Sequence, residues 1–222
     1  SAKSLLAMYI AVAVASGQEV AGLVSERTGP VLFLDWEDEP DGQRERLQAI
    51  CAGLGLALED VPIFHQRMRA SLHEAARDIR KAVAEYGIVL AIVDSVGMAS
   101  GGDPADAAGI MRLMIAARSL GVPVLGIHHL PKDAGDKSRP YGSVYAAAEA
   151  RMTWLVEREE GSAPGVTRVA LTNKKSNRSA RHGRLSFEFQ FASSEDREEL
   201  ASISLRQLSF TEGVGIGQSA PM

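Results

Sequence analysis

The chain has 222 residues, 45% of them hydrophobic and 23% charged, which is the composition of a soluble globular protein with one large core. Its formal net charge of -4 excludes a general electrostatic attraction to nucleic acid or to an anionic membrane, so either partner would need a local basic patch. The single cysteine, Cys51, excludes an internal disulfide framework and a zinc cluster. We expect Cys51 to be a core thiol and the protein to be cytoplasmic.

The chain opens with an apolar run, residues 5–15, that is too short to span a bilayer. A signal-peptide core is the alternative interpretation, but it needs a basic segment upstream and a cleavage site, whereas Lys3 and Ser4 directly precede the run. We therefore predict an apolar helix and no membrane partner. Because there is no initiator Met and the start is abrupt, we expect the natural protein to begin before Ser1.

Short β-rich runs then alternate with helical ones up to Ala150, the pattern of βαβ units with a mainly parallel sheet. Ser71 and Glu74 form a capping box ahead of a helix over residues 72–86. Asp103 followed by Pro104 predicts a second helix that ends at Gly121. Four apolar runs predict strands at the centre of the sheet: residues 31–34, 61–64, 88–93 and 122–127.

Beyond Ala150 the pattern changes to strands joined by short loops, over residues 151–156, 166–172, 185–189 and 203–210. We expect them to continue the sheet in antiparallel fashion. The predicted fold class is therefore α/β, a mainly parallel sheet flanked by helices with antiparallel C-terminal strands. Residues 1–212 are expected to form one domain and residues 213–222 a flexible tail.

The first four residues, Ser-Ala-Lys-Ser, match the end of a phosphate-binding loop, GxxxxGK[ST], directly before the apolar helix. In such a loop, backbone N–H groups surround the phosphates, the lysine neutralises their charge and the hydroxyl binds Mg²⁺. The pattern predicts ATP binding at Ser1, Ala2, Lys3, Ser4 and Leu5, with Ser4 as a magnesium ligand. Ala2 stands where a glycine is usual, and a Lys-Ser pair before a helix is weak evidence by itself.

Two carboxylates follow predicted strands. Asp94 ends the run 90–93, and a carboxylate at the carboxyl end of a central parallel strand suits Mg²⁺ binding through water; the alternative is an aspartate that caps the next turn. Glu37 follows the strand 31–34 and would orient and deprotonate the water that attacks the γ-phosphate. The alternatives there are a solvated acidic loop or a two-metal site made with neighbouring carboxylates: Asp35, Asp38, Glu39 and Asp41.

Two adjacent histidines, His128 and His129, end the strand 122–127. Adjacent residues of a strand point to opposite faces, so the pair is unsuited to binding one metal ion. One of them is expected to face the nucleotide and to report the loss of the γ-phosphate to the following loop, residues 132–142. The alternative is a histidine that caps the end of a strand.

Residues 161–187 contain no acidic residue but several cations: Arg168, Lys174, Lys175, Arg178, Arg181 and Arg184. Such a run is usually a solvated loop. Near an ATP site it would instead place a cation at the γ-phosphate of a neighbouring subunit, or contact a DNA backbone.

Taken in order, these motifs resemble the RecA-like branch of P-loop ATPases over nearly the whole chain. Residues 35–37, Asp-Trp-Glu, resemble the Asp-Ala-Glu that carries the catalytic glutamate of RecA recombinases, and residues 92–96, Ile-Val-Asp-Ser-Val, resemble their Walker B strand. Residues 36–40, Trp-Glu-Asp-Glu-Pro, and the histidine pair look closer to RepA-like plasmid and phage helicases. In that group a histidine replaces a glutamine of RecA, and by position His129 is the match.

The resemblance implies a RecA-like P-loop core that hydrolyses Mg-ATP in a homo-oligomer, a hexamer, with ATP between subunits. It implies a finger cation from residues 173–181, for which the candidates in falling order are Lys174, Lys175 and Arg178. It further implies that Arg44 or Arg46 lies against the adenine. Residues 132–142 correspond to a DNA-binding loop of the family, with Lys132, Lys137 and Arg139 as phosphate contacts, although Asp133 and Asp136 offset their charge.

The leading hypothesis is a motor of DNA replication that moves on single-stranded DNA, either a RepA-like helicase or the helicase half of a phage primase-helicase. A filament-forming recombinase or repair ATPase and a regulatory ATPase with protein partners only remain alternatives. A small-molecule kinase is disfavoured because no Arg-rich lid or acceptor motif follows Asp94. Step direction, ring size and base preference stay open.

Overall fold

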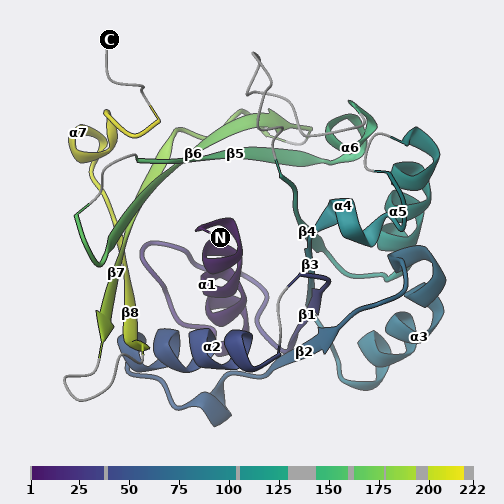
Figure 1. The fold of residues 1–222 in the computed structure, drawn as a ribbon, viewed down its shortest axis with the longest axis horizontal. Helices are drawn as coiled ribbons and strands as arrows, with labels where there is room; N and C mark the ends of the chain where they lie inside the picture. The colour runs from purple at the N-terminus through teal and green to yellow at the C-terminus, as the bar shows by residue number, and fades with distance from the viewer. Residues whose placement is uncertain are drawn as a thin grey trace.

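A computed structural model describes residues 2–37, 40–103, 106–129, 144–159, 163–177, 179–193 and 200–217. Within these ranges the chain forms a parallel sheet of order β2-β1-β3-β4 and an antiparallel sheet of order β5-β6-β7-β8 (Figure 1). The parallel strands are β1 (Val31–Asp35), β2 (Ile63–Arg67), β3 (Leu90–Asp94) and β4 (Val124–Ile127). The antiparallel strands are β5 (Met152–Arg158), β6 (Val166–Ser176), β7 (Leu185–Ser193) and β8 (Leu200–Gln207). The predicted α/β fold class is confirmed.

The helices cover both faces of the parallel sheet. They are α1 (Ala2–Ser16), α2 (Pro40–Leu54), α3 (Leu72–Glu85), α4 (Val96–Ala99), α5 (Ala107–Ser119), α6 (Val144–Glu149) and α7 (Phe210–Gly213), with a 3-10 turn at Leu58–Asp60. Figure 1 shows α1 between the two sheets and α3 and α5 on the far side of the parallel sheet. Accordingly, the α1 side chains share one core with Phe33 and Ile92 of the parallel sheet and with Phe187 and Phe189 of the antiparallel sheet. A second core lies between the other face and α3 and α5.

The expectation that the C-terminal strands continue the parallel sheet is wrong. In the described ranges, β5 to β8 pair with one another and form a sheet of their own. The physical reason is α1, which is apolar around its whole circumference, from Leu5 to Ala15, and needs cover on the side that the parallel sheet leaves free. The separate sheet supplies that cover.

The element boundaries follow the predictions with three corrections. The last strand, β8, covers Leu200–Gln207 and not residues 203–210, because Ser209 caps the N-terminus of α7, which begins at Phe210. The capping box of Ser71 and Glu74 opens α3 as predicted. The next long helix, α5, does not open at Asp103 but after Asp106, whose carboxylate accepts hydrogen bonds from the N–H groups of Ala108 and Gly109. Strand β2 begins later in the chain than predicted. Both β2 and β4 lie at edges of the sheet and not at its centre, and an edge position suits β2 because an edge strand tolerates polar residues such as His65.

The C-terminal residues that are described pack against the antiparallel sheet. Ile216 lies within the segment expected to be a flexible tail, yet it is fully buried beside Ala170 and Leu208. The Arg184 guanidinium donates a hydrogen bond to its carbonyl. Residues 218–222 lie outside the described ranges. Cys51 is buried, as predicted, and burial raises the pKa of its thiol. Among the helices described, none is long and apolar enough to cross a membrane.

Candidate nucleotide-binding site

The carboxyl ends of β1 and β3 meet the N-terminal end of α1. Asp35 and Asp94 are in register on these neighbouring strands and are each two residues beyond Phe33 and Ile92, which face α1. Because side chains two apart share a face of a strand, both carboxylates lie on the α1 side. Both are buried, with 0% and 2% exposure. This edge of the parallel sheet thus brings two carboxylates to the N-terminal turn of α1, which carries Lys3 and Ser4.

Asp94 has an incomplete set of hydrogen-bond partners. The Ser4 hydroxyl hydrogen bonds to its carboxylate. Its other oxygen, Oδ1, is buried and has no partner among the residues that the structure describes. Burial raises the pKa of Asp94, nearby Glu37 and Asp35 raise it further, and the Ser4 hydrogen bond acts in the opposite direction. An orphaned carboxylate oxygen beside a hydroxyl is the oxygen donor set that fits Mg²⁺.

Glu37 lies on a turn held by several hydrogen bonds. Its backbone N–H donates to Asp35 Oδ1 at 2.8 Å, and the indole N–H of Trp36 donates to the carbonyl of Ala70 at 3.0 Å. The Glu37 side chain is 39% exposed and meets His129, whose Nε2 is 3.2 and 3.3 Å from its two carboxylate oxygens. Both residues were predicted to act at the γ-phosphate, but their direct contact was not predicted.

His128, the other member of the pair, is arranged differently. Its Nδ1 lies 2.9 Å from the carbonyl of His129, so Nδ1 carries the proton and donates to that carbonyl. Its Nε2 is then an acceptor, and it is buried without a partner in the described part of the chain. Burial lowers the pKa of His128, nearby His129 and Lys3 lower it further, and the hydrogen bond to His129 opposes them. His128 is therefore a neutral acceptor near Lys3.

Two of the predicted finger cations, Lys174 and Lys175, lie on β6, where the structure separates these adjacent lysines. Lys174 is the extra residue of a β-bulge, because Asn173 pairs with Trp154 and Lys175 with Thr153. The Asn173 amide donates to the carbonyls of Thr153 and Lys175 and so fixes the bulge. Lys174 is exposed. The Lys175 ammonium instead donates to carbonyls of α6, those of Ala147 and Ala148, at 3.1 and 2.5 Å.

The other predicted residues lie on α1 and α2 or outside the described ranges. Arg44 and Arg46 are on the first half of α2, Arg44 exposed and Arg46 half-buried. Leu5 is buried in the core, and Ala2 begins α1. No group of three or more histidine, cysteine or carboxylate side chains placed to bind a metal ion occurs in the described ranges, so the two-metal alternative gains no support there. Outside those ranges lie Ser1, Asp38, Glu39, Lys132, Lys137, Arg139 and Arg178.

Sequence reasoning missed the residues that surround Asp35. Gln43 of α2 and His65 of β2 both contact its carboxylate. The sequence signal was weak, because a polar residue on an edge strand and a glutamine on a helix are ordinary surface features. Only the sheet order, which places β2 beside β1, brings His65 to Asp35.

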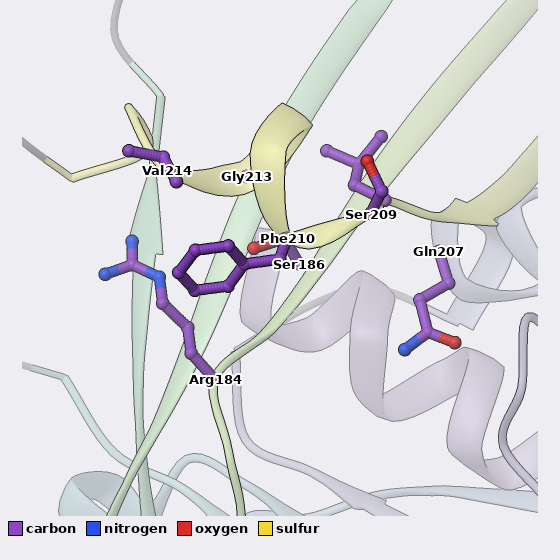
Figure 2. Close-up of a pocket in the computed structure, with 8 residues that line it drawn as sticks. Arg184, Ser186, Gln207, Ser209, Phe210, Gly213 and Val214 are labelled. Carbon is purple, nitrogen blue, oxygen red and sulfur yellow. The ribbon is translucent and has the colours of Figure 1, made fainter.

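A hollow also lies far from this edge, between the antiparallel sheet and α7. Its volume is about 460 Å³. Figure 2 shows Arg184, Phe210 and Val214 around it, with Phe210 79% exposed. Of the residues singled out in the sequence, only Arg184, the last cation of the basic run, contributes to its lining. The lining residues are Arg184, Ser186, Gln207, Leu208, Ser209, Phe210, Gly213 and Val214. The hollow is therefore separate from the candidate site.

A sheet whose carboxyl ends present carboxylates to the first turn of a helix defines a nucleotide-binding α/β protein of the P-loop class. A family model described as an AAA domain matches residues 1–135, which include Lys3, Glu37, Asp94 and His129. The chain therefore belongs to this family of AAA-type P-loop ATPases, and the family implies nucleotide binding. No curated protein matches the chain in a sequence search.

Proposed function

We propose that this protein is a Mg-ATP-hydrolysing, RecA-like motor that acts on single-stranded DNA, as a RepA-like replicative helicase or the helicase half of a phage primase-helicase. The observation that carries the proposal is the contact of Glu37 with His129. It lies at the sheet edge where the Ser4 hydroxyl hydrogen bonds to the Asp94 carboxylate, whose other oxygen has no partner among the described residues. A base, a sensor and a metal ligand thus converge on the helix end that would bind phosphates.

In this mechanism each residue of the edge has a separate task. Lys3 and the N–H groups at the start of α1 bind the phosphates and neutralise their charge. Ser4 and Asp94 would hold Mg²⁺, which when bound would supply further neutralisation of the phosphate oxygens. Glu37 accepts a proton from the water whose oxygen attacks the γ-phosphorus, and the bond to ADP breaks.

The contact between His129 and Glu37 suggests how the site couples to the rest of the protein. In this structure the His129 ring and the Glu37 carboxylate are partners. A γ-phosphate would compete for the ring, release Glu37 for its work on water, and shift the segment that follows His129. That segment, residues 132–142, carries the proposed DNA contacts Lys132, Lys137 and Arg139.

We further propose a ring, a hexamer, in which Lys174 acts as the finger at the site of a neighbouring subunit. Its exposure on a fixed bulge supports this role, since bulges re-aim side chains near active sites. Lys175 has its ammonium on the α6 carbonyls and is the second choice. Arg178 stays the third.

The test is ATP hydrolysis by the protein expressed from its complete gene, with and without single-stranded DNA, over a range of salt concentrations. We expect Mg-dependent hydrolysis that DNA stimulates. Glu37→Gln should lower kcat by about 100-fold or more while ATP still binds. An ATPase rate and a binding signal that are both indifferent to DNA would remove the motor and favour the regulatory ATPase. Hydrolysis by Glu37→Gln at the parent rate would remove the base assignment.

A further inference from the structure

Asp35 is a fully buried carboxylate with partners from three parts of the chain. Its Oδ1 accepts a hydrogen bond from the backbone N–H of Glu37 at 2.8 Å. Its Oδ2 accepts one from the side-chain amide of Gln43 at 2.7 Å, and His65 Nε2 lies 3.2 Å from the same oxygen. The carboxylate thus connects the end of β1, the first half of α2 and the edge strand β2.

These bonds fix the segment that carries Glu37 at both of its ends. The bond from Glu37 to Asp35 closes a turn of the kind that aspartates make with the residue two positions on. On the far side of the segment, Gln43 ties α2 back to the same carboxylate. Within the turn, between Asp35 and Glu37, the backbone N–H of Trp36 donates to the carbonyl of Asp94 at 2.7 Å.

Closing a turn does not by itself explain a buried charge here. Two other carboxylates, Asp94 and Glu37, lie nearby, and the charges of Glu37 and Asp35 both raise the pKa of Asp94. An asparagine would close the same turn without that repulsion. A carboxylate, however, can accept from the Glu37 N–H, the Gln43 amide and His65 at once, because both of its oxygens are acceptors only.

We propose that Asp35 is a positioning residue for Glu37, with Gln43 and His65 holding its carboxylate in place. This inference rests on the proposed function, in which Glu37 is the base. Through the turn, Asp35 directs the Glu37 side chain toward His129, where the two ring-to-carboxylate distances are 3.2 and 3.3 Å. A base that is displaced by about 1 Å loses much of its effect, which is how a residue away from the reacting atoms controls the rate.

The experiment compares Asp35→Ala, Asp35→Asn and Gln43→Leu in the protein expressed from its complete gene. We expect Asp35→Ala to lower kcat by about 10- to 100-fold with less than about a threefold change in the dissociation constant for ATP. Asp35→Asn keeps an acceptor for the Glu37 N–H and should restore most of the rate. Gln43→Leu should lower kcat by about 3- to 10-fold. Asp78→Asn is the matched control, since Asp78 is an exposed carboxylate on α3.

Two further measurements separate positioning from folding and from the proposed function. In the Glu37→Gln background, Asp35→Asn and Gln43→Leu should leave the residual rate unchanged, because they act only through Glu37. Hydrogen exchange over residues 36–43 needs no activity, and protection there should fall in Asp35→Ala and persist in Asp35→Asn.

The outcomes are distinguishable. Equal rate losses in the parent and Glu37→Gln backgrounds, or unchanged exchange in Asp35→Ala, would overturn the positioning role. If Asp35→Ala does not fold, the Gln43→Leu variant takes its place in the test. A kcat and a hydrogen-exchange protection in Gln43→Leu that both equal those of the parent would then overturn the positioning role. A parent protein that does not hydrolyse ATP would overturn the proposed function. Hydrogen-exchange protection over residues 36–43 that falls in Asp35→Ala and persists in Asp35→Asn would still show that Asp35 fixes this segment.

Discussion

Asp94 at the end of the parallel sheet and Glu188 within the antiparallel sheet are both almost fully buried carboxylates, with 2% and 4% exposure. Glu188 accepts hydrogen bonds from Arg168 at 2.6 Å, Arg206 at 3.1 Å and Gln190 at 3.0 Å. Asp94 has the Ser4 hydroxyl and one oxygen with no partner in the described ranges. The protein thus supplies hydrogen-bond donors to both oxygens of Glu188, whereas Asp94 keeps one oxygen available for a ligand.

The same contrast appears in the pKa values. The arginine hydrogen bonds, that of Arg168 above all, lower the pKa of Glu188, whereas burial raises the pKa of Asp94. A buried carboxylate whose oxygens are all hydrogen bonded stabilises the fold. A buried carboxylate that lacks partners lowers folding stability, and such groups are typical of functional sites. The parallel sheet is thus the half that carries the candidate site, and the antiparallel sheet is the half that encloses α1.

The largest expected effect is that of Asp94→Asn, which tests this contrast directly. We expect Mg-dependent hydrolysis to fall by about 100-fold or more, because the proposed magnesium ligand is lost. Stability should change in the opposite direction. A raised carboxyl pKa means that the folded state favours the protonated form, so this stabilisation is present at low pH and is lost as pH rises through the folded-state pKa.

At pH 7 the charged Asp94 therefore destabilises the folded protein, and Asp94→Asn should raise the free energy of unfolding by about 1 kcal/mol. The gain should disappear below about pH 4, near the usual pKa of an aspartate. Urea denaturation from pH 4 to pH 8 measures it. A variant that is less stable at pH 7 and hydrolyses ATP at the parent rate would make Asp94 a turn-capping residue.

Gly53 tests whether the two halves unfold together, because it lies where α2 packs on β8. A Cβ added there would lie 2.0 Å from the backbone oxygen of Ile203, which cannot move aside without shifting the strand. Gly53→Ala should therefore lower the free energy of unfolding by about 3 kcal/mol. Gly42→Ala on the same helix meets nothing within 4 Å and should be neutral or stabilising, by up to about 1 kcal/mol.

The two tryptophans report the two halves separately, since Trp36 follows β1 and Trp154 lies on β5. Denaturation followed by fluorescence in Trp36→Phe and Trp154→Phe backgrounds measures each half. Coincident transitions, both moved by Gly53→Ala, are expected of one cooperative domain. Two separated transitions would contradict the prediction that residues 1–212 form a single unit.

Glu188→Ala should have a smaller effect and only on stability. Removing the carboxylate takes one ion-pair partner from Arg168 and from Arg206. These side chains are 38% and 50% exposed, so water can hydrate their guanidinium groups in its place. We expect a loss of about 2 kcal/mol, below the usual cost of breaking a fully buried pair, and ATP hydrolysis within about twofold of the parent. Asp78→Asn, an exposed ion-pair partner, is the control and should change stability by less than about 0.5 kcal/mol.

The pH dependence gives the Glu188 prediction a second readout. The lowered pKa means that its stabilisation is present above the ordinary pKa of a glutamate and is lost as pH falls through the lower folded-state value. The difference between parent and Glu188→Ala should therefore shrink in acid, below about pH 4. This is the reverse of the behaviour expected for Asp94→Asn. A difference that grows in acid would contradict the assignment.

The sequence predicted those features that a short local pattern determines by itself. Apolar runs predicted β1 and β3, and the Ser71 capping box predicted the start of α3. Carboxylates that follow such strands must reach the carboxyl edge of a parallel sheet, which is why Glu37 and Asp94 could be singled out before the fold was known.

What could not be predicted depends on contacts between distant parts of the chain. The contact of Glu37 with His129 joins residues 92 positions apart. His65 reaches Asp35 only because β2 pairs with β1, and the bulge that separates Lys174 from Lys175 depends on the partner strand β5. Periodicity gives the type of an element, whereas register and pairing come from packing.

Tyr9→Phe has the smallest expected effect and tests how α1 is held between the two sheets. The Tyr9 hydroxyl is fully buried and donates to the carbonyl of Ile203 at 2.6 Å. Burial, with a smaller contribution from nearby Cys51, raises the pKa of Tyr9, so the phenol keeps its proton and remains a donor. Losing this bond should cost about 1 kcal/mol in urea denaturation and leave ATP hydrolysis unchanged.

The Ile203 carbonyl is also the group that Gly53 approaches, so β8 is fixed between α1 and α2 at one point. Tyr9→Phe and Gly53→Ala should therefore not be additive. Once the added methyl group has displaced the carbonyl, the tyrosine has little left to bind, and the double variant should be less destabilised than the sum of the two single variants. Additive losses would mean that α1 and α2 hold the antiparallel sheet independently, and that the site-bearing half and the enclosing half are coupled less closely than this shared carbonyl indicates.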